Sequence, residues 1–142
     1  MHFKNSDTEI CLTVDGYTDF PEAFSEEIGK NALVCTVSYL LPRDWGEGVL
    51  FDEIFQTYDI TRFCELLSDL LCNKTDNILY KDEWDYFTFN AKKAGNKFEV
   101  YVNIIDRCST EDINGTFVMT FFELKEIQEE LQEYMLKFPS VD

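Results

Sequence analysis

Histidine, glycine, proline and positive charge are all scarce in this chain. Its 142 residues include one His, 6 Gly and 3 Pro, and 12 Lys and Arg stand against 28 Asp and Glu. The one histidine, His2, lies at a terminus that we expect to be frayed, so catalysis through His–Cys or Ser–His pairs is essentially excluded. No glycine-rich phosphate loop, HExxH or GxSxG string occurs. We therefore expect a protein that is not an enzyme and needs no cofactor.

Cysteine pairs and long apolar runs are also missing. The five cysteines are isolated, their number is odd and no CxxC occurs, which argues against a disulfide framework and against a zinc site. No segment approaches the roughly 18 apolar residues needed to cross a membrane, and the N-terminal residues lack the apolar core of a secretory signal. These absences predict a cytoplasmic protein without a metal or a membrane partner.

Negative charge is what the chain has in excess. The formal net charge is −16 at pH 7. Nucleic acids and anionic membranes are bound through Lys and Arg, so both should be repelled, whereas a basic protein should be attracted. The same charge also fits a protein that is acidic for solubility alone, and both interpretations stay open.

The apolar residues predict one α+β domain spanning residues 1–142. Hydrophobic residues make up 45% and aromatic residues 15%, which is enough for a packed core. Period-two alternation and turn residues predict strands at 9–14, 33–40, 49–58, 84–91, 97–106 and 114–121, with turns at 15–16 and 93–96. Helical spacing predicts helices at 59–72, capped by Asp59, and at 123–138. The sheet or sheets should be mostly antiparallel.

Two strand-to-helix junctions repeat one pattern. Tyr58-Asp59-Ile60 is matched 64 positions later by Phe122-Glu123-Leu124, and an apolar helical stripe follows each. An acid in the first turn suits the helix dipole, and the aromatic residue before it could staple the helix entry to the core. The pattern indicates two β-meander-plus-helix halves, which arose either by duplication or because the same physics was used twice.

Three acidic groups are candidate partner-binding sites. They are Asp82, Glu83 and Asp85 around Trp84; Glu126, Glu129, Glu130 and Glu133; and Glu111 with Asp112. An aromatic side chain ringed by carboxylates can anchor a partner while the charges steer it. Reversing the charges of the first group should therefore slow association and leave folding little changed. Alternatively, Trp84 packs inward, and the acids between 126 and 133 form a solvated helix face.

The order of these segments resembles that of the WapI-type immunity proteins, the partners of bacterial wall-associated contact-dependent toxins. The resemblance covers residues 31–138, and the segments that carry it are Leu33–Leu40, Val49–Leu71, Trp84–Phe89, Phe98–Ile104 and the closing helix after Phe121-Phe122-Glu123-Leu124. It implies a role in neutralising a toxic domain, commonly a nuclease, and it transfers no binding residue. Two other interpretations remain open: an acidic adaptor for a basic peptide or protein, and a carboxylate-based hydrolase or lyase.

Overall fold

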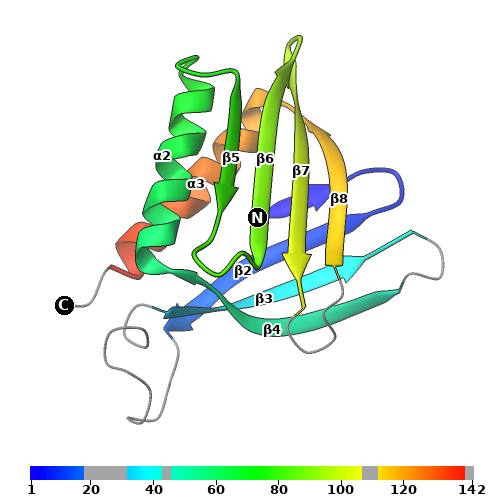
Figure 1. The fold of residues 1–142 in the computed structure, drawn as a ribbon, viewed down its shortest axis with the longest axis vertical. Coiled ribbons are helices and arrows are strands. Elements are labelled where there is room, and N and C mark those ends of the chain that lie inside the picture. Colours follow the sequence, from blue (N-terminus) through cyan, green and yellow to red (C-terminus); the bar gives the residue numbers. More distant parts are fainter. Residues whose placement is uncertain (18–31, 43–45, 107–111, 140–142) are drawn as a thin grey trace.

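The protein forms two four-stranded antiparallel sheets and two helices (Figure 1). The computed structural model describes residues 1–17, 32–42, 46–106 and 112–139, with the side chains of 51–53 excepted. The first sheet contains β1 (His2–Lys4), β2 (Glu9–Tyr17), β3 (Ala32–Leu40) and β4 (Glu47–Gln56). The second contains β5 (Asn77–Lys81), β6 (Phe87–Ala94), β7 (Lys97–Ile105) and β8 (Asp112–Met119), and the helices are α2 (Thr57–Leu71) and α3 (Phe121–Lys137). Each sheet is ordered as in the sequence and is followed by one helix, which confirms the α+β class and the two meander-plus-helix halves.

Alternating apolar residues form the inner faces of both sheets, as predicted. In β2, Ile10, Leu12 and Val14 are buried, and in β7 every second residue from Phe98 to Ile104 is buried. The apolar stripes of both helices also point inward, with only Leu71 and Met135 half-buried. Period-two and helical spacing therefore located most of the core correctly.

The two shortest strands, β1 and β5, were not predicted, because three and five residues carry too little alternation. β1 is firmly held: Phe3 is fully buried, with its ring 5.7 Å from that of Phe117 and 6.1 Å from that of Phe89. The Met1 amino group donates a hydrogen bond to the Leu12 carbonyl at 2.6 Å. The expectation of a frayed terminus at His2 was therefore wrong.

Several turn and strand boundaries differ from the prediction; among them, β4 and β8 each lie two residues earlier than the strands predicted at 49–58 and 114–121. Asp15-Gly16 does not turn the chain; it lies within β2, where the register with β3 shifts between Val14 and Gly16. β6 begins at Phe87 rather than at Trp84 and continues to Ala94, which pairs with Lys97. The predicted turn at 93–96 is real but shorter, and Gly95 adopts the positive φ (66°) that it requires.

The 64-residue repeat lies at the helix starts. Asp59 is not the N-cap of α2: the N-cap is Gln56, whose backbone N–H donates to the Asp59 carboxylate at 2.8 Å. In α3 the N-cap Thr120 donates in the same way to Glu123 at 3.0 Å and accepts from the Glu123 N–H at 3.2 Å. The repeat thus marks a capping box. The aromatic staple was wrong, because Tyr58 and Phe122 lie inside the helices and are exposed.

The two helices pack against each other, and each also contacts the sheet of the other half through side chains. The Phe63 ring of α2 stacks on Tyr80 at 4.5 Å and lies 4.9 Å from Phe89, both in the second sheet. From α3, the Tyr134 hydroxyl accepts the Val14 N–H of β2 at 3.3 Å. Figure 1 shows α2 along β5 and α3 passing behind the second sheet. The two halves consequently share one hydrophobic core.

Of the helices that the structure describes, none is long and apolar enough to cross a membrane.

Candidate functional site

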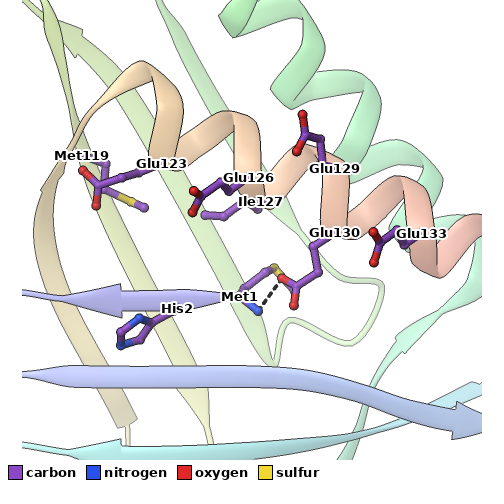
Figure 2. Close-up of a pocket in the computed structure, with 9 residues that line it drawn as sticks. All are labelled: Met1, His2, Met119, Glu123, Glu126, Ile127, Glu129, Glu130 and Glu133. Carbon is purple, nitrogen blue, oxygen red and sulfur yellow. Dashed lines mark ion pairs between the residues drawn. The ribbon is translucent and has the colours of Figure 1, made fainter.

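An acidic groove lies between α3 and the N-terminal residues (Figure 2). It has a volume of about 430 Å³, and Met1, His2 and Met119 contribute to its lining. The rest is mainly carboxylate, from Glu123, Glu126, Glu129, Glu130 and Glu133 of α3. Glu123, Glu126, Glu130 and Glu133 follow one another at three or four residues, as do Glu126, Glu129 and Glu133, so the helix presents these acids on one side. The buried stripe that begins at Leu124 fixes the rotation of the helix and hence the direction of the acids.

Two of these glutamates make contacts within the protein. Glu123 is part of the capping box of α3. Glu130 forms an ion pair with the Met1 amino group at 2.5 Å and accepts a hydrogen bond from the Tyr134 hydroxyl at 3.1 Å. Burial raises the pKa of Tyr134, and the Glu130 charge adds to that rise, so this hydroxyl stays protonated and donates. Glu130, a predicted contact residue, is thus largely occupied within the chain.

The other three acids belong to an exposed line of residues along α3, which we call the α3 stripe. It consists of Phe122, Glu126, Glu129, Glu133 and Leu136, spaced four, three, four and three residues apart, and all five are exposed. The rise of the helix makes it about 21 Å long. Its apolar ends are very open, with Phe122 76% and Leu136 85% exposed.

The charge of the α3 stripe is not balanced nearby. Within the described part of the chain, no cation forms an ion pair with Glu126, Glu129 or Glu133. Like charges three and four residues apart destabilise a helix by about 0.2–0.5 kcal/mol per pair. A basic partner would remove this repulsion, so the arrangement favours binding of positive charge.

The group around Trp84 is only in part the surface patch that we predicted. Asp82 is only 2% exposed and accepts the backbone N–H groups of Trp84 at 3.1 Å and Phe87 at 2.7 Å. It shapes the β5–β6 connection and cannot contact a partner, so reversing its charge would damage the fold. Trp84 is half-buried, and Glu83 and Asp85 are exposed. Glu83 accepts hydrogen bonds from the side chains of Gln56 and Tyr58.

The remaining predicted site residues lie elsewhere. Asp112 is exposed at the start of β8, whereas α3 follows the other end of that strand. Glu111 lies outside the described residues. Of the predicted acids, the structure brings Glu126, Glu129, Glu130 and Glu133 together, whereas Asp82, Glu83, Asp85 and Asp112 do not line the acidic groove.

Among the described residues, Asp59 and Asp82 are the carboxyl groups with raised pKa values. Burial is the main cause for both; it raises the pKa of Asp59 to about 6, and the Asp82 charge adds to that rise. Each accepts backbone N–H groups, and neither lines the acidic groove. A catalytic pair must reach its substrate, whereas these acids are enclosed and fix the chain around them. Neither of these two acids is therefore placed to act on a ligand in the acidic groove.

Three contributors to the site escaped the sequence analysis. Met1 and His2 were assigned to a frayed end, and Phe122 was placed against the core. The signal for Phe122 was available, because residues 122, 126, 129, 133 and 136 share one helical face, while Leu124, Ile127, Leu131 and Phe138 share another. β1 offered only His2-Phe3-Lys4, a single polar–apolar–polar alternation.

No protein-family model matches this sequence, and a search of curated proteins gave no match either. The family resemblance thus rests on the segments and apolar pattern given above.

Proposed function

We propose that this protein is an immunity protein of the WapI type, which binds a basic toxic domain one-to-one and blocks it. The α3 stripe is the observation that carries the proposal. It offers three glutamates without a described ion-pair partner, flanked by an exposed aromatic and an exposed aliphatic side chain.

The chemistry of the α3 stripe suits the active-site face of a nuclease. A nuclease collects Lys and Arg to hold phosphates. Glu126, Glu129 and Glu133 would pair with such residues, while Phe122 and Leu136 would supply the desolvated contacts that usually dominate binding energy. The net charge of −16 would accelerate the encounter. Occlusion of the phosphate-binding groove would then stop the toxin without any chemical step.

The α3 stripe is also held in place before binding. The capping box fixes the start of α3, and Leu124, Ile127 and Leu131 anchor its inner face. The Met1–Glu130 ion pair ties the helix to β1. A prearranged surface loses less conformational entropy on association, which favours tight binding.

An adaptor for basic peptides is the second candidate, and the acidic groove is the observation that favours it. A volume of about 430 Å³ lies within the usual range of ligand pockets. Partner selectivity separates the two functions: an immunity protein binds one toxin, whereas an adaptor binds several unrelated basic sequences with similar affinity.

The test uses two charge-matched triple variants. The first changes Glu126, Glu129 and Glu133 to Lys; the control changes Glu47, Glu65 and Glu99, which are exposed on other elements. Each tagged protein is used to capture partners from the native host at rising salt. We expect the wild type and the control to retain one dominant basic protein, and the stripe variant to lose it.

The captured protein is then expressed in a test strain with each variant. Growth arrest relieved by the wild type and the control, but not by the stripe variant, would support the immunity function and its surface. Unchanged toxicity with the wild-type protein present would contradict the proposal. Capture of many unrelated basic proteins with similar salt sensitivity would favour the adaptor.

A further inference from the structure

Three metal-binding side chains meet on the outward face of the β1–β2 hairpin. His2 pairs directly across the two strands with Cys11, and Glu9 lies two residues from Cys11 on the same face. The His2 Nε2 atom is 2.9 Å from Glu9 Oε1, and the Cys11 Sγ atom is 4.0 Å from that same oxygen. All three ligand atoms lie within 4.8 Å of one another.

We propose that His2, Glu9 and Cys11 form a binding site for a divalent transition-metal ion, with Zn²⁺ the best match. Imidazole, carboxylate and thiolate are the three side-chain donors that Zn²⁺ uses in proteins. Zinc–ligand bonds of about 2.0–2.3 Å place neighbouring donors of a tetrahedral site about 3.3–3.7 Å apart. The observed separations of 2.9 and 4.0 Å bracket that range, so small side-chain rotations complete the site. A water molecule or a partner's side chain would fill the fourth position.

The strands hold these ligands in a fixed frame. β1 is anchored by the buried Phe3 ring and by the hydrogen bond from the Met1 amino group to Leu12. The pairing of β2 with β3 holds Glu9 and Cys11 from the other side. Little backbone ordering is therefore needed on binding, and the net charge of −16 raises the local cation concentration.

Lys4 is the competing cation at this site. Its Nζ atom lies 3.9 Å from Glu9 Oε2, while the His2 and Cys11 atoms approach Oε1. Such an exposed pair contributes little to stability. Lys4 can keep its contact with Oε2 while Oε1 turns to the metal. On binding, the Cys11 thiol releases its proton to water and the His2 Nε2 lone pair faces the ion.

Metal binding would link this site to the acidic groove, because His2 belongs to both. An ion on His2, Glu9 and Cys11 would tie β1 to β2 and steady one wall of the groove. The metal site rests on its own geometry and would stand even if the proposed immunity function failed.

The test is a titration of the full-length, tag-free protein with Co²⁺ in the presence of a thiol-free reductant. We expect one Co²⁺ per chain, a thiolate-to-cobalt absorption band, and displacement by Zn²⁺. Cys11→Ser and His2→Gln should each abolish the band and weaken Zn²⁺ binding at least tenfold. Glu9→Gln should weaken it less severely. Added Zn²⁺ should raise the melting temperature of the wild type and leave that of Cys11→Ser unchanged.

The matched control is Cys72→Ser. Cys72 is an exposed free cysteine at the end of α2 and belongs to no ligand cluster among the described residues. This variant should keep the band and the affinity. Absence of a band at equimolar Co²⁺, or a band that disappears with Cys72 but survives the loss of His2, would overturn the proposal. Weak binding that no variant changes would mean an adventitious ion only. Circular dichroism confirms that each variant is folded.

Discussion

Asp59 is a buried carboxyl group that accepts the backbone N–H of Gln56 at the start of α2. Burial raises its pKa from the usual aspartate value of 3.8 to about 6. Because the folded state holds this proton more tightly than the unfolded state, the group contributes stability that is fully present below about pH 4. That contribution is lost as the pH rises through about 6.

Replacing Asp59 with Asn should therefore flatten the pH dependence of stability. A shift of about two pKa units corresponds to about 3 kcal/mol in the free energy of unfolding. We expect wild-type stability to fall relative to Asp59→Asn by up to that amount between pH 4 and pH 7. Urea unfolding at four pH values measures it, with the exposed Asp85→Asn as the control. Parallel curves for the wild type and Asp59→Asn would contradict this account.

Single positions differ in how well the sequence predicts them. Leu67 and Leu131 belong to periodic apolar stripes, and both are fully buried. Asp82 was misassigned because nothing local distinguishes a carboxylate that caps a turn from one that faces water. Its burial depends on backbone amides at Trp84 and Phe87, whose positions follow from the β5–β6 connection. Periodicity reports on faces of elements and does not report on such turns.

At the scale of elements, α3 has an inner apolar line and the outer α3 stripe, which serve different purposes. The inner line includes Leu131, which is fully buried, and the outer line ends at Leu136, which is 85% exposed. Both are leucines in the same helix, five residues apart, so helix propensity is equal for the two. Their environments alone separate core packing from the α3 stripe.

Leu131→Ala and Leu136→Ala should accordingly affect different properties of the protein. Leu131→Ala should lower the free energy of unfolding by about 2–5 kcal/mol, because it leaves a cavity. Leu136→Ala should change it by less than about 0.5 kcal/mol and should weaken the partner complex instead. Thermal unfolding measures the first effect, and partner titration the second. Equal destabilisation by the two changes would disprove the two-line description of α3.

For the whole molecule, the class and the two-half order were predictable, and the packing of the halves was not. An apolar stripe shows that α2 or α3 is buried, but it does not say on which sheet. Phe63 contacts Tyr80 and Phe89 in the second sheet, and Tyr134 contacts Val14 in the first. Which sheet each helix contacts depends on how the complete chain packs, and the sequence of a single segment does not show it.

The net charge of −16 should make stability depend on salt. Self-repulsion destabilises the compact state, and added salt screens it, with a Debye length of about 8 Å at 0.15 M. We expect the melting temperature to rise by several degrees between low salt and 0.5 M KCl. The Debye length shortens further, to about 3 Å, as the salt approaches 1 M. Changing Glu126, Glu129 and Glu133 to Gln should reduce that rise. A melting temperature that falls or stays constant would show that the charges are already compensated.

The contacts between each helix and the sheet of the other half also determine when parts of the core can form during translation. On the ribosome, α2 is finished at Leu71, but its ring partner Phe89 follows 18 residues later, roughly 1–4 s at usual rates of synthesis. The contact between β2 and α3 forms later still. β2 ends at Tyr17, and Tyr134 of α3 is synthesised 117 residues later, after roughly 6–23 s. The part of the protein that is made first is therefore the last to be fully covered: Phe55 and Phe3 can meet Phe87 and Phe89 earlier, but the surface around Val14 stays open to other chains until α3 is made.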